Sequence, residues 1–126
     1  MNKHVTLLIT LAAVVLASTS AYAAPGQATQ AIFKHLMAAT VSNNYNSFVA
    51  ECDATMKAAL TKPMLEGVSN QIAPRAKQGY DPKYLGELNQ HGYKVNLWRL
   101  RFRDGGDDVL ATLSVKDGEA GGFYLH

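Results

Sequence analysis

Two short turn signals near the C-terminus constrain the fold more than any other feature of this sequence. They are Asp104-Gly105-Gly106-Asp107 and Lys116-Asp117-Gly118-Glu119. Glycine accepts the positive φ that a two-residue hairpin turn requires, so each signal predicts a tight turn between antiparallel strands. Counting residues outward from the first turn predicts that Phe102 lies opposite Val109, Leu100 opposite Ala111, and Trp98 opposite Leu113. Counting outward from the second turn predicts that Val115 lies opposite Ala120, Leu113 opposite Gly122, and Ala111 opposite Tyr124.

These pairs predict one apolar sheet face that is assembled from three strands. Directly opposed residues share a face of the sheet, and side chains alternate between the two faces along a strand. The residues on this face are Trp98, Leu100, Phe102, Val109, Ala111, Leu113, Val115, Ala120 and Tyr124. We therefore expect this face to pack against helices.

The opposite face of the sheet is predicted to be amphipathic. Counting places Arg103 opposite Asp108 as a cross-strand ion pair. The patch beside this pair consists of Leu97, Arg99, Arg101, Leu110, Phe123 and Leu125. A cluster of exposed apolar residues marks a contact surface, and arginine and aromatic residues are enriched at protein interfaces. The patch predicts a homodimer interface, and a solvated face with scattered apolar residues is the alternative.

Helical periodicity precedes the sheet, and it predicts a first helix over residues 27–41. The apolar face of this helix consists of Ile32, Phe33, Leu36, Met37 and Thr40. These positions recur at the three- and four-residue steps of one helix face. Ser42-Asn43-Asn44 can end this helix and cap the next one. The second helix is predicted to have a break near Asp53 and to carry on one side Tyr45, Phe48, Val49 and Cys52.

A third helix is predicted to begin after Thr61, which acts as its cap, with Pro63 tolerated in its first turn. Its apolar stripe consists of Met64, Leu65, Val68 and Ile72. Pro74 and Gly79 are predicted to end this helix, because proline and glycine are poor residues for continuing one.

A further strand is predicted over residues 83–90, before the two hairpins. Gly86 inside it indicates a bulge or a bend. His91 and Gly92 are expected to form the turn into the strand that contains Trp98.

The first 23 residues have the three parts of a secretory signal peptide. Lys3 gives a positive start, an uncharged apolar run follows, and Ala21-Tyr22-Ala23 places small residues where a signal peptidase reads. The apolar run of about 13 residues is too short for a membrane-spanning helix. No cysteine lies near the cleavage point, which disfavours a lipoprotein. We expect cleavage after Ala23, export to the periplasm rather than the extracellular medium, and one domain over residues 24–126.

The exported chain has a nearly balanced charge and one cysteine. Without Lys3 it carries 11 basic and 10 acidic side chains, and it has no basic run of the kind that binds nucleic acid. Cys52 cannot form an internal disulfide, so the hydrophobic core must stabilise the domain alone. Burial of Cys52 as a small hydrophobe is the main expectation. A bond between two chains or a reactive thiol is the alternative.

Three segments resemble secreted bacterial members of the nuclear transport factor 2-like, cystatin-like cone superfamily, which are mostly domains of unknown function. The segments are residues 44–48, residues 93–106 and residues 117–125. The likeness covers about residues 27–125 and implies an α+β fold, with N-terminal helices packed on a strongly curved antiparallel sheet. It also implies a pocket between the helices and the sheet, and a homodimer through the outer face of the sheet.

Apolar residues from the helices and from the inner sheet face are the candidate lining of such a pocket. They are Phe33, Phe48, Met64, Trp98, Leu100 and Tyr124. A packed core is the plainer interpretation of the same residues. A filled interior would leave a role in protein contacts.

Residue spacing gives no indication of catalysis. His35, His91 and Asp53 are ionisable, yet no two of them have the spacing of a general acid–base pair or a metal site. Their ordinary roles are an exposed helix histidine, a turn residue and a helix cap. We predict an exported, non-catalytic domain without cofactor or metal that binds a small apolar ligand or a protein partner. A small isomerase- or dehydratase-like enzyme of the same fold is the alternative.

Overall fold

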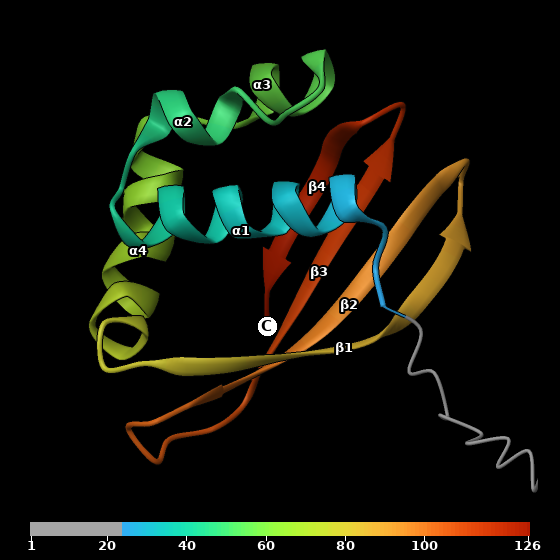
Figure 1. The fold of residues 1–126 in the computed structure, drawn as a ribbon. Coiled ribbons are helices and arrows are strands. Elements are labelled where there is room, and N and C mark those ends of the chain that lie inside the picture. Colours follow the sequence, from blue (N-terminus) through green and yellow to red (C-terminus); the bar gives the residue numbers. More distant parts are fainter. Residues whose placement is uncertain (1–23) are drawn as a thin grey trace, which may run out of the picture.

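Four helices precede four strands in the described part of the chain, which is residues 24–126 of the computed structural model (Figure 1). The elements are α1 (Gln27–Val41), α2 (Tyr45–Val49), α3 (Ala54–Ala59), α4 (Lys62–Ala76), β1 (Tyr80–Gln90), β2 (Tyr93–Phe102), β3 (Val109–Lys116) and β4 (Glu119–Leu125). The α+β class predicted from the sequence is confirmed. The predicted signal peptide lies outside the described residues. No helix within residues 24–126 is long and apolar enough to cross a membrane.

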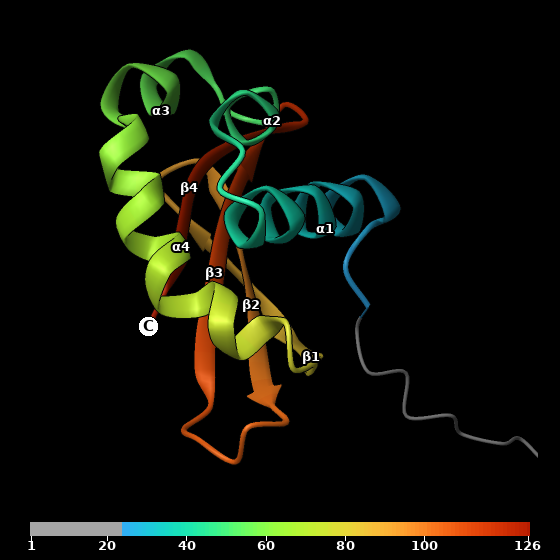
Figure 2. The same ribbon diagram turned by 90° about the vertical axis from the view of Figure 1, so that its left-hand side faces the viewer.

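The strands form one antiparallel sheet in the order β1-β2-β3-β4. Two perpendicular views show α1 crossing one face of the sheet and α4 running beside its β4 edge (Figure 1, Figure 2). The sheet is not strongly curled, so the strong curvature expected from the resemblance is wrong. Bulges and glycine kinks are what curve a sheet. Here they occur in the edge strands β1 and β4, and the central pair β2 and β3 runs without a register shift.

The prediction for α1 is confirmed, including its bounds. The buried face of α1 contains Ile32, Phe33, Leu36, Met37 and Thr40. The break predicted near Asp53 separates α2 from α3. The Asp53 carboxylate accepts a hydrogen bond from the Met56 amide and caps α3. Thr61 caps α4 in the same way, through the Met64 amide.

The C-terminal end of α4 differs from the prediction. Pro74 lies inside the helix, which continues to Ala76. At this position near the end of the helix, proline removes one backbone N–H and the helix ends soon afterwards. Gly79, with a φ of 103°, then turns the chain into β1. Of the predicted apolar stripe, Leu65 and Ile72 are buried, whereas Met64 and Val68 are exposed, so the prediction is confirmed for two of its four residues.

The first predicted hairpin turn is wrong in length, and the register of β2 against β3 differs from the prediction by two residues. Leu100 lies opposite Val109, and Trp98 lies opposite Ala111. The connection between the strands spans residues 103–108. A difference of two residues keeps every side chain on its predicted face, because side chains alternate with a period of two. The apolar inner face predicted for these two strands is therefore confirmed.

Contacts with α4 explain the longer loop. The Asp104 carboxylate accepts a hydrogen bond from the Gly106 amide at 2.8 Å, and Arg75 Nε donates to it at 2.7 Å. Arg75 also donates to the Asp107 carbonyl at 2.6 Å and lies over the Phe102 ring. Charge-assisted hydrogen bonds of this kind are stronger than neutral ones. They hold a wide turn that the local turn composition does not predict.

Hydrogen bonds from Arg75 and then from the Gly106 amide lower the pKa of the Asp104 carboxyl. In the unfolded chain the pKa of an aspartate is roughly 3.9. The stability that this contact contributes is present above that value and is lost as pH falls through the lower pKa of the folded state.

We expect Arg75→Gln to raise the pKa of Asp104, measured by NMR titration of its carboxyl carbon. Arg101→Gln, which removes the partner of Asp108, is the matched control and should leave Asp104 unchanged. An unchanged pKa in Arg75→Gln would contradict the assignment.

The second predicted turn is confirmed. Asp117 and Gly118 take positive φ angles of 51° and 75°. Val115 pairs with Ala120, as predicted. Beyond this pair, Gly121 is an extra residue in β4 and forms a bulge.

The bulge at Gly121 moves the last residues of β4 to the opposite faces of the sheet. Phe123 lies opposite Leu113. Phe123 and Leu125 pack against the core, whereas Tyr124 is 61% exposed. A one-residue slip exchanges the two faces of a strand. The faces predicted for these three side chains are therefore wrong.

Contacts around Gly121 account for the bulge. A Cβ atom at this position would collide with the Tyr93 ring and would lie 3.1 Å from Asp53 Oδ2. The preceding residue, Ala120, donates its N–H to the Glu51 carbonyl and accepts at its carbonyl from the Asp53 amide, each at 2.8 Å. The start of β4 is thus held by the segment between α2 and α3, and a glycine is required where the chain passes the Tyr93 ring.

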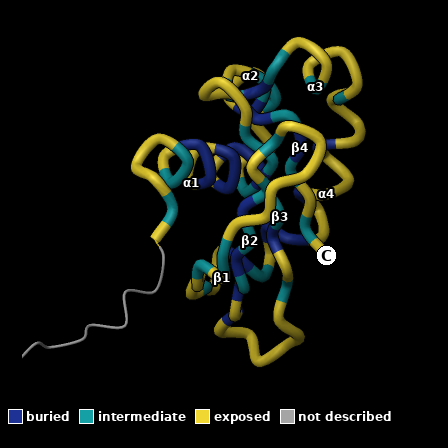
Figure 3. The backbone as a smooth tube through the Cα atoms, turned by 90° about the vertical axis from the view of Figure 1, so that its right-hand side faces the viewer, coloured by how far each residue is buried: buried dark blue, intermediate teal, exposed yellow. Residues whose placement is uncertain are grey.

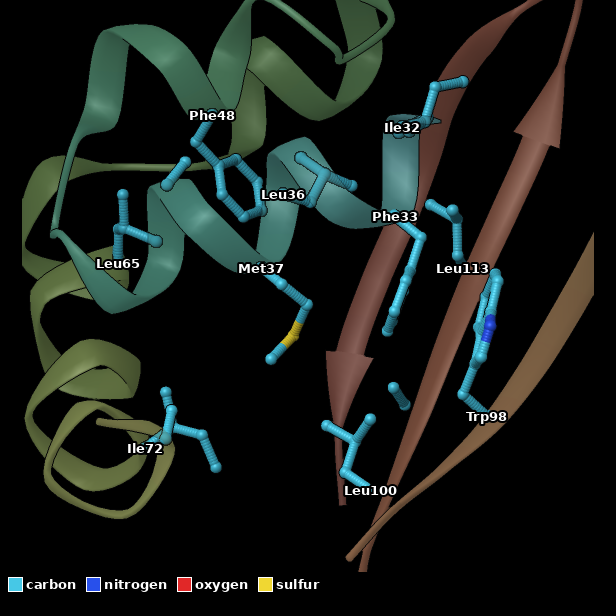
Figure 4. Close-up of a cluster of buried hydrophobic side chains, with 14 of the residues drawn as sticks. Ile32, Phe33, Leu36, Met37, Phe48, Leu65, Ile72, Trp98, Leu100 and Leu113 are labelled. Atoms are coloured by element: carbon cyan, nitrogen blue, oxygen red, sulfur yellow. The ribbon is translucent and has the colours of Figure 1, made fainter. Parts of the chain in front are cut away.

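The core lies between α1 and the inner face of the sheet, where Figure 3 shows the buried parts of both. Phe33 from α1 stacks on Trp98 from β2, with ring centroids 4.1 Å apart (Figure 4). Leu36, Leu100 and Leu113 surround this stack and are fully buried. Three large apolar residues of the strands, Trp98, Leu100 and Leu113, therefore pack against the buried face of α1.

Candidate functional site

The interior between α1 and the sheet, where the resemblance implies a pocket, is filled by side chains. Phe33 and Trp98 are each 2% exposed, and Leu100 is fully buried. The structure places these three candidate pocket residues in the packed core. The interior therefore has no room for the pocket that the resemblance implies, and a ligand site has to lie elsewhere on the molecule.

An open groove lies instead between α3, α4 and the β4 edge of the sheet, with a volume of about 680 Å³. This volume is within the range of ligand-binding clefts in proteins. The remaining three candidates from the sequence, Phe48, Met64 and Tyr124, line this groove. The sequence did not predict the groove itself, because it is formed by two helices and a strand edge that are far apart in the chain.

The helix walls of the groove are apolar. On α4, the residues that face it include Met64, Val68 and Gln71, which follow each other at steps of four and three residues. Met56 on α3 and Leu60, which directly follows α3, also line the groove. Met64 is 54% exposed and Val68 is 43% exposed, although both are apolar. Adjacent exposed apolar residues of this kind are typical of a contact surface.

The groove offers little acid–base chemistry. Among the described residues that line it, the Tyr124 phenol is the one ionisable side chain. His35 Nδ1 lies 2.8 Å from Glu51 Oε1 in a separate surface depression. His91 lies in the turn between β1 and β2, with a φ of 52°, and Asp53 caps α3. The turn and cap roles predicted for these two residues are confirmed.

Within residues 24–126, no group of three or more His, Cys, Asp or Glu side chains is arranged to hold a metal ion. Cys52 is buried between α2 and α3, as a small hydrophobe would be, and its Sγ donates to the Phe48 carbonyl at 3.3 Å. Burial, and then the neighbouring Asp53 carboxylate, raise the pKa of the Cys52 thiol to about 11. Since the thiolate is the reactive form of cysteine, this environment suppresses its chemistry.

Native Cys52 is expected to react with iodoacetamide at pH 8 at least about tenfold more slowly than the same thiol in the unfolded chain. Both the raised pKa and the burial of Sγ lower the rate. Mass spectrometry of timed samples, with and without urea, measures the two rates. Equal rates would show that the thiol is accessible and ionised in the folded protein.

The outer face of the sheet carries a second apolar surface. Leu88, Leu110 and Tyr124 are exposed on it. Leu97 is half-buried in the strand between them, and Arg99 lies opposite Leu110. α1 packs against the opposite face of the sheet (Figure 1, Figure 2).

Two members of the interface predicted from the sequence do not belong to this surface. Phe123 and Leu125 pack against the core on the helix side of the sheet. Arg101, rather than Arg103, forms the ion pair with Asp108, at 3.2 Å, because the first hairpin is offset by two residues. The homodimer through the outer face stays a prediction.

Sequence comparisons do not assign a family to this chain. No protein-family model matches it, and a search of curated proteins finds no match. Since a fold alone does not define a function, the function has to be argued from the chemistry of the groove.

Proposed function

We propose that this protein is an exported, non-catalytic domain that binds an apolar ligand in the groove between α3, α4 and β4. The observation that carries the proposal is the groove itself, which has a volume of about 680 Å³ and a lining without a carboxylate, amine, guanidinium or imidazole group. An isomerase- or dehydratase-like reaction would need an acid or a base in this position. A binding role needs only the apolar walls.

The exposed side chains in the groove give the binding its driving force. Met64 and Val68 on α4 lose contact with water when a ligand covers them. Burial of apolar surface contributes roughly 25 cal/mol per Å². Covering these two side chains and their neighbours therefore makes a favourable contribution to the free energy of binding. The few polar groups of the groove, including Gln71 and the Tyr124 phenol, would orient the ligand.

Export to the periplasm and a relationship to the nuclear transport factor 2-like superfamily are part of the same proposal. The small residues Ala21 and Ala23, after an apolar run, support export. The order of helices followed by an antiparallel sheet supports the relationship. Native mass spectrometry of the protein from its own compartment tests this part, because an N-terminus at Ala24 and a retained ligand would appear together.

Val68→Asp is expected to weaken the binding of Nile red, an apolar fluorophore, to the mature domain at least about tenfold. The new carboxylate would lose water in a groove that offers it no charged partner. Leu88→Asp is the matched control, because it places the same charge at an exposed apolar position on the outer face. Fluorescence titration gives both dissociation constants. Equal weakening in the two variants, or no binding by the unmodified domain, would overturn the proposal.

A further inference from the structure

The groove runs along the outer edge of β4, and we propose that it binds an extended peptide segment of another protein, which pairs with this edge as an added strand. This inference rests on the proposed function, because it names the class of ligand that the same groove takes. In such complexes, main-chain hydrogen bonds provide affinity and alternate side chains provide specificity.

The ladder between β3 and β4 directs backbone groups of β4 into the groove. Leu110 and His126 exchange both backbone hydrogen bonds, at 2.9 and 2.8 Å. Hydrogen-bonded pairs alternate along an antiparallel ladder. The N–H and C=O groups of Tyr124 therefore face β3, and those of Phe123 and Leu125 face away from it. All three residues line the groove, so its strand wall presents main-chain donors and acceptors.

The same edge already accepts an extended segment at its start. Cys52 forms a parallel bridge with Ala120, through the Glu51 carbonyl and the Asp53 amide. α3 then leads the chain away from the sheet. Over residues 121–125, no other described segment pairs with this edge of β4. A peptide in the groove would continue the pairing that the segment around Cys52 begins.

The two edge strands of the sheet differ in their protection against pairing. β1 contains Pro82, which has no N–H, and a bulge at Leu85, next to Gly86. Prolines and bulges are common devices that prevent an exposed edge from pairing. The part of β4 that lines the groove has no proline and no charged residue, and its bulge at Gly121 precedes the regular ladder. The β4 edge therefore remains suited to strand addition.

The helix walls define the side chains that the peptide would carry. Met64 and Val68 on α4 and Met56 on α3 are apolar, and no charged residue lines the groove among those described. Successive side chains of a strand point to opposite sides, so every second residue of the peptide would face these walls. A charged side chain there would be desolvated without a partner. The ligand class is therefore an uncharged extended peptide with apolar residues at alternate positions.

The available edge of β4, residues 121–125, is about 17 Å long at about 3.4 Å per residue. The probe is a blocked peptide of alternating valine and threonine that matches this length, with a lysine at each end for solubility. We expect it to bind the mature domain and to slow hydrogen exchange of the Phe123 and Leu125 amides at least about tenfold. The Tyr124 amide, which already faces β3, is the internal control and should change little.

N-methylated forms of the probe separate strand pairing from apolar contact. Methylation of the amides that face β4 should weaken binding at least about tenfold, and methylation of the alternate amides should not. Leu125→Pro removes one N–H from the edge without removing a bond to β3, and Leu125→Ala keeps that N–H. Peptide affinity should therefore fall more in Leu125→Pro than in Leu125→Ala. The Nile red affinity of each variant measures how far the substitution alters the apolar lining, to which Leu125 belongs. If the proline variant does not fold, the methylated peptides still decide.

Three other results would contradict the inference, each in a different way. Displacement of Nile red by the peptide, without slower exchange at Phe123 and Leu125, would overturn strand addition and leave the proposed function standing. Protection of these amides in the domain alone, with a dimer in sedimentation, would assign the edge to a second copy of the chain. Failure of both Nile red and the peptide to bind would overturn the proposed function as well.

Discussion

Trp98→Ala is expected to lower the free energy of unfolding by about 3–5 kcal/mol. The Trp98 ring stacks on Phe33 at 4.1 Å and lies 5.2 Å from the Tyr84 ring, and the side chain is 2% exposed. Its removal loses this burial and leaves a cavity between α1 and β2. A folded domain has a total stability of about 5–15 kcal/mol, so the variant would lose a large fraction of it. Urea denaturation followed by circular dichroism measures the change.

Leu88→Ala is the control for Trp98→Ala, because Leu88 is a large apolar residue of the same sheet that is 46% exposed. A change within about 0.5 kcal/mol is expected for it. A loss below about 1 kcal/mol in Trp98→Ala would mean that the interior is not closed around the indole ring. Such a result would return Trp98 to the lining of an internal pocket.

Phe123→Ala is expected to destabilise the domain by about 2–4 kcal/mol, and Tyr124→Ala by less than about 1 kcal/mol. The Phe123 ring contacts two core rings, at 6.4 Å from Phe33 and 6.1 Å from Phe48. Tyr124 is 61% exposed on the other side of β4. The two adjacent residues thus report directly on the register of the last strand, through their free energies of unfolding.

The opposite order of effects would contradict the bulge at Gly121. With the register predicted from the turn alone, Tyr124 would lie in the core and Phe123 would lie on the outer face. Tyr124→Ala would then be the more damaging change, and Phe123→Ala would be nearly neutral. Because both variants remove one aromatic ring from the same strand, each is the control for the other.

The elements that the sequence predicts well are those whose signals are local. The buried face of α1 repeats at helical spacing, so Phe33 and Met37 could be assigned to it before any tertiary contact was known. Asp53 and Thr61 cap the next helices through hydrogen bonds that reach only three residues along the chain. The Asp117-Gly118 turn is equally local, since it depends on the φ angles of its own residues.

The two errors in strand register have different consequences for the site. In the first hairpin, Arg75 and Asp104 lengthen the loop, and the two-residue offset leaves Trp98 and Leu100 on the inner face. In the second hairpin, the bulge at Gly121 exchanges the faces of the strand end. The predicted pocket and interface residues in β2 and β3 could therefore be assigned to the correct face, whereas those in β4 could not.

By itself, the sequence determined the order of helices and strands, the helix caps, the turn between β3 and β4, and the inner face of β2 and β3. All of these depend on periodicity or on contacts within a few residues. Only the tertiary structure decided the placement of Phe123, Tyr124 and Leu125, because the Tyr93 ring and the segment around Cys52 hold the bulge at Gly121 from distant parts of the chain. The same long-range packing fills the expected interior pocket and opens the groove beside β4. Side chains of a strand alternate between the two faces of the sheet. The residue pattern of β4 alone therefore does not show that Gly121 is inserted as an extra residue.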